Sequence, residues 1–324
     1  MKYDVITFGS ATLDAFIQSP DLRVAPSRQS VTGEDLIVPY GIKSEVSNFL
    51  MAGGGGASNV AVGVTRLGLR AAVVARCGWD LPGKMVRQEL KKEKVSDELL
   101  IQLEGDETDY STILIGPDGK RTILVWRGRT RLEKSLLNFK KLNSFWFYIA
   151  SLEGNLKLLA ELIAFAKASH IKLILNPGKK EIEQGELFLD LAKKAEFLVV
   201  NREEADRLGK GKSLLLPKTT VIITEGEEGL TAHIPGKGRP ACRRGRLIMP
   251  GFKVKMTDQT GAGDGFSAGL VAGLAKGWDL EKAVKLGLAN GASVVTKIGA
   301  RPGLIRESEV DFWLSQPLEY HWEK

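Results

Sequence analysis

The feature that most constrains the fold is a regular alternation of short apolar segments with segments of helical length. Runs such as VITFG (5–9), KLILN (172–176) and FLVVN (197–201) are almost continuously apolar. Between such runs lie helix-like segments, and in residues 156–169 the apolar positions recur at the i, i+3 and i+4 spacing of one helix face. Continuously apolar strands are typical of parallel sheets that helices cover on both sides. We therefore predict an α/β fold with a doubly covered, mostly parallel β-sheet.

Two segments interrupt this alternation, at residues about 30–51 and about 108–127. The second contains two strand-like runs, STILIG and KRTILVW, joined by the turn Pro117-Asp118-Gly119. Because both segments fall between strand–helix units, we predict that they form a small sheet that projects from the main domain. Such a sheet could be a lid, a dimerisation surface or both, or it could be a hairpin without a role.

Composition excludes several classes of protein. Hydrophobic residues make up 43% of the 324 residues and charged residues 26%, so a disordered, collagen-like or coiled-coil chain is not expected. The two cysteines, Cys77 and Cys242, are too few for a disulfide scaffold or a cysteine zinc site and indicate a reducing compartment. The first residues lack the pattern of a signal peptide, and no apolar run reaches the roughly 18 residues that a membrane helix needs. We expect a cytoplasmic protein without a membrane partner.

The formal net charge of +7 suits an anionic partner, such as nucleic acid, a membrane surface or a phosphorylated metabolite. However, the basic residues are not interleaved with aromatic ones. The densest basic run, Lys237 to Lys255, is either a solvated face or a field that helps to hold anions. We expect no nucleic-acid partner.

The strongest chemical signal is the segment TDQTGAGDGFSAGLVAGLAKG, Thr257 to Gly277, in which a glycine-rich turn leads into Asp264 and then a helix of small residues. The first N–H groups of a helix lack internal partners and carry the positive end of the helix dipole, so such a turn can bind an anion. An Asp beside it could accept the proton of a substrate hydroxyl while the N–H groups stabilise a transferring phosphoryl group. Asp264 could equally be a helix N-cap. Asp258 could be a second anion, a cation ligand or a turn residue.

A second glycine-rich segment, AGGGGASNVAVGVTRLG (52–68), leads into a helix with Asn59 in its first turn. A dinucleotide site would need its glycines directly after the first strand and an acid at the end of the next strand. Here the glycines follow the inserted strands, and the next strand ends in Arg76-Cys77-Gly78, so NAD binding is not expected. The G-x-x-x-x-G-K-[ST] loop of P-loop enzymes is also missing. The first strand instead delivers Asp14, which is either a binding residue or a structural one.

Two further candidates follow predicted parallel strands. NREE (Asn201 to Glu204) comes after FLVVN, and TEGEEG (Thr224 to Gly229) comes after VIITE. Ligands of open α/β sheets bind at the carboxyl ends of the strands. Asn201 and Glu204 would share one face of a helix start, where they could hold magnesium through water or could simply cap the helix.

Taken together, these motifs resemble those of the ribokinase-like (PfkB) family of carbohydrate and nucleoside kinases, over roughly residues 3 to 313. Both glycine-rich motifs are specific, and their order and separation also fit. The resemblance implies a single ribokinase-like α/β domain, 1–324, with a small β-sheet lid formed by insertions at about 15–51 and 105–130. It also implies ATP and Mg2+ as cofactors.

The resemblance further implies residue roles. Asp264 would be the base that takes the proton of the acceptor hydroxyl. The anion hole would consist of the backbone of Gly261, Ala262 and Gly263. The acceptor would be bound by Asp14, Gly54, Gly55, Asn59 and Glu153. The nucleotide would be bound by Asn201, Thr224, Gly226, Gly229 and Asn290. The residues near metal ions would be Asn201 and Glu204 for magnesium and Asp258, with the loop GARPGL (299–304), for a monovalent cation (K+).

The sequence departs from the family pattern at two positions. Gly56 stands where ribokinases often carry Lys, so one polar contact to a sugar is missing. Gly303 offers no side-chain ligand in the loop that resembles the monovalent-cation site.

The leading hypothesis is an ATP-dependent kinase of a ribose- or fructose-like sugar. A sugar-phosphate kinase is an alternative that would need basic residues near the acceptor, such as Lys43, Arg127 or Arg129. A nucleoside kinase is another, and its apolar slot could be lined by Phe16, Tyr40 and Trp126. A third class, a non-catalytic sugar- or nucleotide-binding regulator, is disfavoured by the intact turn before Asp264.

Lids of this family often pair, which implies a homodimer through the lid. The residues Ile113, Ile115, Ile123 and Val125 alternate along the two lid strands and could provide one buried face for such a dimer.

Overall fold

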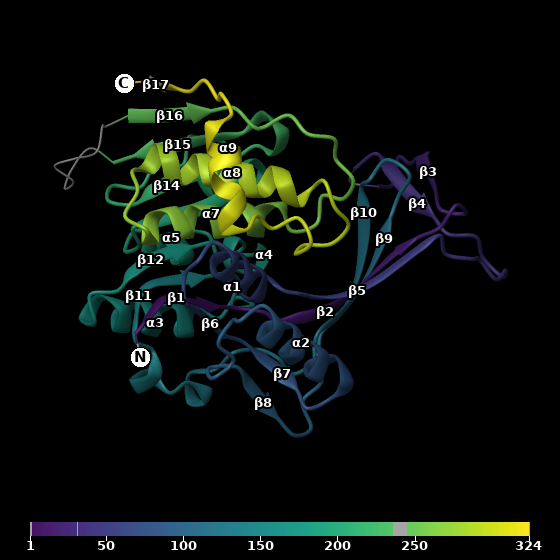
Figure 1. Ribbon diagram of the computed structural model, residues 1–324, viewed down its shortest axis with the longest axis horizontal. Coiled ribbons are helices and arrows are strands. Elements are labelled where there is room, and N and C mark those ends of the chain that lie inside the picture. The colour runs from purple at the N-terminus through teal and green to yellow at the C-terminus, as the bar shows by residue number, and fades with distance from the viewer. Residues whose placement is uncertain (1, 31, 236–244, 324) are drawn as a thin grey trace.

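A nine-stranded sheet forms the centre of the molecule (Figure 1). The computed structural model describes residues 2–30, 32–235 and 245–323, so Cys242 and the basic residues from Lys237 to Arg244 lie outside the described residues. In spatial order, the strands are β17 (His321–Glu323), β16 (Gly245–Met249), β15 (Leu230–Ile234), β14 (Thr220–Thr224), β13 (Phe197–Asn201), β12 (Lys172–Leu175), β11 (Ser144–Ile149), β1 (Tyr3–Phe8) and β6 (Ala71–Val74). The strands from β14 to β6 are parallel to one another. The neighbouring pairs β14–β15, β15–β16 and β16–β17 are antiparallel.

Helices cover both faces of this sheet because its strands are apolar on both sides. Ile174 and Ile222 belong to one buried cluster, whereas their neighbours Leu173 and Val221 belong to the other, as the period of two along a strand requires. The first cluster includes residues of α1 (Gly56–Arg66), α2 (Leu81–Lys92), α7 (Ala262–Ala275), α8 (Leu280–Val294) and α9 (Val310–Ser315). The second includes residues of α3 (Leu156–Ala168), α4 (Lys179–Ile182), α5 (Glu186–Ala192) and α6 (Arg202–Gly209). The predicted fold class is confirmed.

A second, four-stranded sheet stands at one side of the main body, and we call it the small sheet (Figure 1). In spatial order it consists of β10 (Arg121–Trp126), β9 (Tyr110–Ile115), β2 (Thr12–Gln18) and β5 (Asn48–Gly54). The predicted hairpin of STILIG and KRTILVW is the antiparallel pair β9–β10. Two short pairs complete the strands: β3 (Arg23–Pro26) with β4 (Glu34–Ile37), and β7 (Arg76–Gly78) with β8 (Ile101–Leu103).

Residues 71–78, which the sequence predicts to be one strand, form two strands in separate sheets. β6 pairs with β1 in the main sheet, whereas β7 pairs with β8. The apolar run ends at Arg76, where β7 begins, but no Gly, Pro, Asn or Asp separates the two strands to mark a turn between them.

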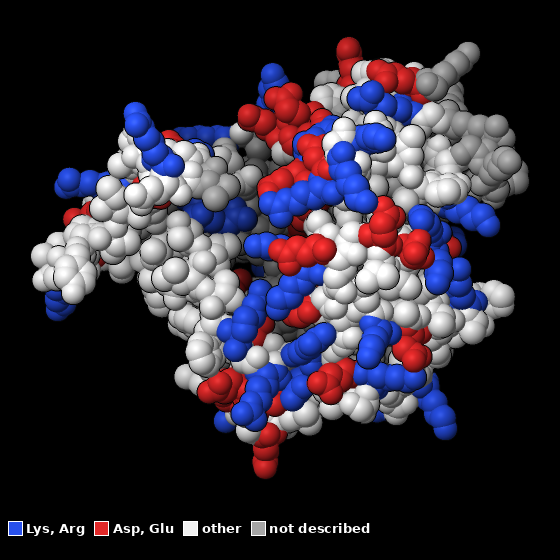
Figure 2. Space-filling model, turned by 180° about the vertical axis from the view of Figure 1, so that it is seen from behind, with Lys and Arg blue, Asp and Glu red and all other residues white. Residues whose placement is uncertain are grey.

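The small sheet lies beside the edge where the parallel strands of the main sheet end. β1 passes through only three residues into β2, so the carboxyl end of β1 leads directly into the small sheet. Figure 2 shows a cleft between the small sheet and the main body, bordered by Lys and Arg atoms. Ligands of parallel α/β sheets bind at this edge, so the fold directs attention to this cleft.

The face of the small sheet that we expected to pair with a second copy is its inner face, which turns toward the main body. Asp14 pairs with Ser111, and Ser111 pairs with Val125, so these side chains share one face. On the same face, Ile113 and Ile115 are buried beside Ile298 of the main body. Ile113 and Ile115 are therefore not available for the predicted dimer face, because the main body already covers them, whereas Ile123 and Val125 remain 41% and 46% exposed.

No helix in residues 2–30, 32–235 and 245–323 combines the length and the apolar character needed to cross a membrane.

Candidate active site

The starts of two helices bring Asp264 and Asn59 together. Asp264 lies in the first turn of α7 and Asn59 in the first turn of α1. The Asn59 Nδ2 donates a hydrogen bond of 2.8 Å to Asp264 Oδ2. The two helices approach closely because α1 carries a glycine at the contact: a Cβ on Gly63 would lie only 2.5 Å from the Cβ of Ala268. Both predicted glycine-rich motifs therefore contribute to one site.

Burial raises the pKa of the Asp264 carboxyl above its ordinary value. The Asn59 hydrogen bond opposes this rise, the negative charge of Asp14 adds to it, and the guanidinium groups of Arg301 and Arg121 oppose it. A carboxyl with a raised pKa is a stronger base once it is ionised, and a pKa closer to neutral favours general base catalysis. Asp264 has no side-chain capping hydrogen bond to α7, whose N-cap is Gly261. The N-cap alternative for Asp264 is therefore wrong.

The turn before α7 presents backbone N–H groups toward open space. Gly261 has a φ of 80°, in the left-handed region, and α7 begins at the next residue, Ala262. A Cβ on Gly263 would meet no atom of another segment within 4 Å, so the first turn borders open space at this residue. The first N–H groups of a helix lack partners within the helix, and at this position they can bind an anion.

Asp14 faces the same region from the small sheet. It is 7% exposed, and Thr12 Oγ1 donates a hydrogen bond of 3.0 Å to its Oδ1. Burial raises the pKa of Asp14, and hydrogen bonds from Ser111 and Thr12 oppose this rise. Gly54, at the end of β5, lies against the Asp14 carboxylate, and the next residue, Gly55, is the N-cap of α1. The candidate acceptor residues on the small sheet are thus adjacent to one another.

Glu153 follows β11 at the same edge and has strained backbone geometry. Its φ of 56° is unusual for a non-glycine residue, and such strain is often found at functional sites. Its carboxylate lies 2.7 Å from Lys180 Nζ and 3.6 Å from a terminal guanidinium nitrogen of Arg127. Arg127 also forms a 2.8 Å ion pair with the buried carboxylate of Asp109. Arg127 therefore links Glu153 to Asp109, the residue that precedes β9 of the small sheet.

The candidate nucleotide residues lie on neighbouring strand ends. Asn201 and Thr224 are paired residues at the ends of β13 and β14. Asn201 and Glu204 form a capping box, because each side chain accepts a hydrogen bond of 2.9 Å from the backbone N–H of the other residue. The capping alternative for this pair is therefore confirmed. Gly226 has a φ of 62°, and a Cβ at this position would meet no atom within 4 Å, so this turn borders open space.

The capping box does not occupy the whole Glu204 carboxylate. It uses Oε2, which leaves Oε1 to accept another ligand. Burial raises the pKa of Glu204, and the Asn201 N–H opposes this rise. Within the described part of the chain, there is no group of three or more His, Cys, Asp or Glu side chains that could hold a metal ion. One carboxylate at a strand end suits Mg2+ only if the phosphates of a nucleotide complete the coordination.

Asp258 is fully buried and connects two loops. Its Oδ1 accepts hydrogen bonds from the backbone and side chain of Thr260, at 2.9 and 2.7 Å, and its Oδ2 accepts one from Gly299 N at 2.8 Å. Asp258 thus fixes the loop that begins at Gly299 beside the turn before α7, as a turn residue does. These contacts use both carboxylate oxygens, so they provide no argument for a bound K+ ion.

The structure places Asn290 away from any ligand surface. Its side chain is 0% exposed, and it links α8 to two other segments. Asn290 Nδ2 donates to Gly265 O at 2.7 Å, and Asn290 Oδ1 accepts from Ile305 N at 2.8 Å. The prediction that Asn290 binds the nucleotide is therefore wrong, because a fully buried amide with both ends paired cannot contact the adenine.

A known protein family matches most of the chain. The family model "pfkB family carbohydrate kinase" matches residues 29–306. The chain belongs to this family. It is 25% identical to a ribokinase from Bacillus subtilis over 305 residues, which cover 92% of this chain and 97% of the ribokinase. It is 28% identical to a probable fructokinase-5 from Arabidopsis thaliana, with 81% of this chain and 87% of that protein covered.

Among solved structures, the fold is similar to that of a nucleoside kinase from Methanocaldococcus jannaschii. The TM-score is 0.78 at 23% sequence identity, and 97% of this chain and 98% of the other chain are covered. As a pfkB family member, this chain is a phosphotransferase with an alcohol group as acceptor. The prediction of a ribokinase-like kinase is confirmed.

Two arginines that sequence reasoning missed lie close to the pfkB glycine motifs. Arg301 donates a hydrogen bond from Nε to Asn59 Oδ1 at 2.9 Å. Arg121, on β10, lies close enough to Asp258 and Asp264 to interact with both charges. Arg301 lies in the GARPGL loop (299–304), but no local pattern indicates which distant residue an arginine contacts.

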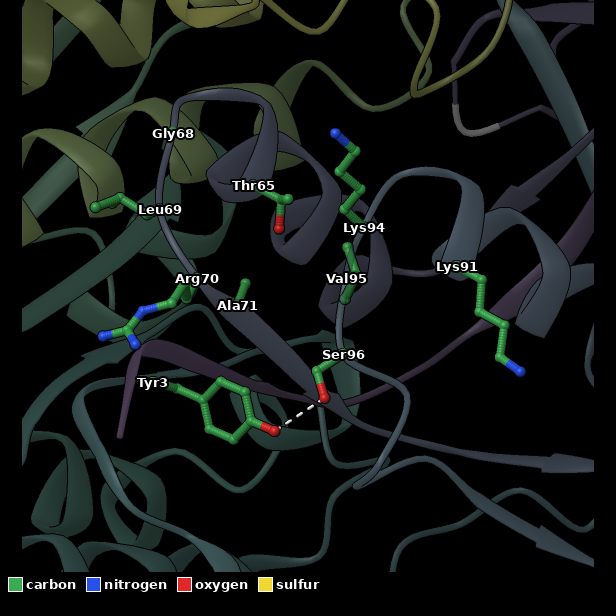
Figure 3. A pocket seen from close by; sticks show the side chains of 10 residues that line it. All are labelled: Tyr3, Thr65, Gly68, Leu69, Arg70, Ala71, Lys91, Lys94, Val95 and Ser96. Carbon is green, nitrogen blue, oxygen red and sulfur yellow. Dashed lines mark hydrogen bonds between the residues drawn. The ribbon is translucent and has the colours of Figure 1, made fainter. Parts of the chain in front are cut away.

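A hollow of about 520 Å3 lies where β1 and β6 begin, at the edge of the sheet opposite to the one that leads to the candidate site (Figure 3). Its lining includes Tyr3 and Ala71, the first residues of β1 and β6. Figure 3 shows that the charged groups of Arg70, Lys91 and Lys94 point away from one another. These cations do not converge on one anion, so the hollow is not a second candidate site.

Proposed function

We propose that this chain is an ATP-dependent kinase that transfers the γ-phosphate to a hydroxymethyl group of a ribose- or fructose-like sugar. The observation that carries the proposal is the contact between Asp264 and Asn59 beside the open turn Gly261–Gly263. It combines a carboxylate of raised pKa with backbone N–H groups at the start of a helix, which is what phosphoryl transfer to a hydroxyl requires.

In the proposed reaction, the acceptor hydroxyl donates its proton to Asp264 Oδ1, since Oδ2 is held by Asn59. The acceptor oxygen then attacks the γ-phosphorus in line with the leaving ADP oxygen. The N–H groups of the turn Gly261–Gly263 stabilise the negative charge on the transferring group. Asp14, Gly54 and Gly55 orient the sugar, and positioning of this kind accounts for a large part of catalysis.

The nucleotide would lie along the ends of β13 and β14. Asn201, Thr224, Gly226 and Gly229 would contact it there. Mg2+, held by the nucleotide phosphates and Glu204 Oε1, would supply positive charge to the phosphates. The small sheet would act as a lid that excludes water from the cleft. Within this proposal a cation at Asp258 has no required role.

An acceptor panel tests this function. Purified protein with ATP and Mg2+ is expected to release ADP in the presence of ribose, fructose or a related sugar, and the product should gain the mass of one phosphoryl group. The same panel includes nucleosides and sugar phosphates. If no member of the panel is phosphorylated although ATP and a sugar both bind, the protein is a non-catalytic regulator and the proposed function is wrong.

A nucleoside is the second candidate acceptor, and one observation favours it. Ile123 and Val125 lie on the face of the small sheet that carries Asp14, and they are 41% and 46% exposed. Apolar side chains that remain exposed beside a sugar-binding carboxylate suit an acceptor with an attached planar base. The residues that sequence analysis proposed for this slot do not form it, because Phe16 is buried and Tyr40 is fully exposed.

A sugar-phosphate acceptor is disfavoured by the pairing of Arg127. This arginine is one of three basic residues that could bind a phosphate, but its guanidinium already pairs with Asp109 and lies near Glu153. Binding of a second anion would have to compete with a buried carboxylate.

The outer face of the small sheet supports a homodimer. Phe49, Leu124 and Trp126 are 56%, 57% and 58% exposed, and β10 is an edge strand. Exposed apolar side chains on a sheet edge are typical of a protein interface. We therefore place the lid-mediated dimer on this outer face rather than on the inner face.

Replacing Leu124 and Trp126 with Lys is expected to convert such a dimer to monomers. Loss of one interface anchor costs about 2 kcal/mol, which weakens the dimer roughly 30-fold. Sedimentation across a range of concentrations measures the dissociation constant. Leu187→Lys is the matched control, because Leu187 is also exposed but lies on α5. A wild-type protein that is monomeric, or a dimer that survives both lid substitutions, would contradict the proposal.

A further inference from the structure

Arg301 is a buried cation that connects the end of β5 to the start of α1. Its side chain belongs to the loop after α8, and the residue is only 4% exposed. One terminal nitrogen donates to Glu89 Oε2 at 2.9 Å, and the other donates to Ser58 Oγ at 2.7 Å. Glu89 Oε2 also accepts a 2.7 Å hydrogen bond from Gly53 N. The guanidinium thus holds the glycine-rich end of β5 and the start of α1 in one arrangement.

The loop that carries Arg301 is itself fixed at several points. Arg66 donates to the backbone oxygen of Arg301 at 2.7 Å. The preceding residue, Ala300, packs against Gly261 of the turn before α7. Gly299, two residues before Arg301, donates a hydrogen bond from its backbone N–H to Asp258 Oδ2. Arg301 therefore extends from a rigid base, so its guanidinium can impose an orientation on the groups that it contacts.

The contact between Arg301 and Asn59 decides which way the Asn59 amide points. A guanidinium has only donors, so the atom that faces Arg301 Nε must be the amide oxygen. The amide nitrogen then faces Asp264, whose ionised carboxylate has only acceptors. A flipped amide would place a donor against a donor and an oxygen against a carboxylate. The chain from Arg301 to Asn59 to Asp264 therefore has one favourable arrangement.

We propose that Arg301 is a positioning residue for phosphoryl transfer. It orients the Asn59 amide, and this amide holds Asp264 Oδ2, so that Asp264 Oδ1 is left to take the proton of the substrate hydroxyl. The catalytic consequence rests on the proposed function, whereas the orientation of Asp264 does not. Arg301 does not contact the reacting atoms in this scheme and acts through Asn59. No other residue in the described part of the chain is shown to donate a hydrogen bond to Asn59 Oδ1.

Arg301 also affects the charge of Asp264. The charged or titratable groups that face Asp264 come from four elements: Asp14 on β2, Arg121 on β10, Tyr148 on β11 and Arg301 on the loop after α8. Asp14 disfavours ionisation of Asp264, whereas Arg301 and Arg121 favour it. Removal of Arg301 would therefore raise the pKa of Asp264, both by loss of a cation and by release of the Asn59 hydrogen bond.

Two variants of Arg301 separate its charge from its geometry. Arg301→Met removes both, and Arg301→Lys keeps a positive charge but cannot serve Asn59, Glu89 and Ser58 together. We expect kcat to fall about 10- to 100-fold in Arg301→Met and less in Arg301→Lys, with the KM for ATP unchanged, because only part of the effect of a positioned base is lost. The matched control is Arg76→Lys, which disrupts another paired, partly buried arginine (Arg76 to Asp106, 2.6 Å) without contact to the site. It is expected to lose stability without loss of kcat.

A double-mutant cycle tests whether Arg301 acts through Asn59. Asn59→Ala and Arg301→Met are combined, and each variant is assayed at a temperature where thermal unfolding shows that it is folded. If Arg301 acts through Asn59, the double variant is no slower than the slower single variant. If the two losses multiply, Arg301 acts independently and the proposal is wrong.

A titration of Asp264 gives a readout that does not require turnover. The protein is labelled with 13C at the Asp carboxyl carbons, and Asp264→Asn identifies the signal. The midpoint for Asp264 is expected at higher pH in Arg301→Met than in wild type and unchanged in Arg76→Lys. An unchanged midpoint in Arg301→Met would overturn the proposal. A raised midpoint in a protein that phosphorylates no acceptor would reject the proposed function while supporting the link between Arg301 and Asp264.

Discussion

Replacing Asp264 with Asn is expected to lower kcat by about 10²- to 10⁴-fold and to leave the affinity for ATP close to that of wild type. Asn has nearly the same shape and can still accept the hydrogen bond from Asn59 Nδ2 through its amide oxygen. It cannot accept the proton of the acceptor hydroxyl. The loss should therefore appear in the chemical step, which a single-turnover assay with saturating ATP and acceptor measures.

Stability provides an internal check on this substitution. Burial raises the pKa of Asp264 in the folded state, so stability is lost as the pH rises from the ordinary pKa of Asp to the raised pKa, and the full loss remains at higher pH. Asn is uncharged at every pH and removes this cost. Asp264→Asn should thus unfold at the same temperature as wild type or a higher one near neutral pH. Loss of activity then cannot be attributed to unfolding.

Asp279→Asn is the matched control for Asp264→Asn. Asp279 also stands at the start of a helix, but it is the N-cap of α8 and its Oδ1 accepts a 2.8 Å hydrogen bond from Lys282 N. We expect this variant to keep its kcat, because Asn is also a good N-cap. An Asp264→Asn enzyme that retains more than about 10% of wild-type kcat would show that another group is the base.

The sequence predicts the elements that depend on local pattern. The main parallel strands are visible as apolar runs, and the hairpin β9–β10 is visible from the turn at Pro117 to Gly119. The first turns of α1 and α7 are visible because glycine clusters precede helical segments. In each case the physical cause, burial on both faces or a backbone that needs glycine, acts within a few neighbouring residues.

The parts that escaped prediction depend on contacts between distant residues. Arg301 and Asn59 are separated by 242 positions, and no periodicity links them. Asn290 is polar and lies on a helix that the family resemblance places near the nucleotide, yet it pairs with Gly265 and Ile305 inside the fold. The inner and outer faces of the small sheet have the same alternation in sequence. Only the position of β2 relative to the main body decides that Val125 turns inward and Trp126 outward.

Gly261→Ala is expected to have the second large effect, because a side chain at this position would displace the proposed anion hole. The added Cβ would lie 2.5 Å from the Cβ and 2.6 Å from the Cα of Ala300. Contacts of this length with a backbone atom force the turn and the loop at Ala300 apart. Since the N–H groups of the turn are proposed to stabilise the transferring phosphoryl group, we expect kcat to fall about 10²- to 10³-fold.

Backbone strain and displacement of the turn can be separated with Gly277→Ala. Gly277 lies just beyond the other end of α7 and has a φ of 77°, close to the 80° of Gly261, but a Cβ there would meet no atom within 4 Å. Both substitutions carry the cost of a left-handed residue with a side chain, about 1 kcal/mol in each case. Thermal unfolding and kcat are measured for both variants. A kcat loss confined to Gly261→Ala would follow from displacement of the turn, whereas equal kcat in the two variants would contradict the assignment of the anion hole to residues 261–263.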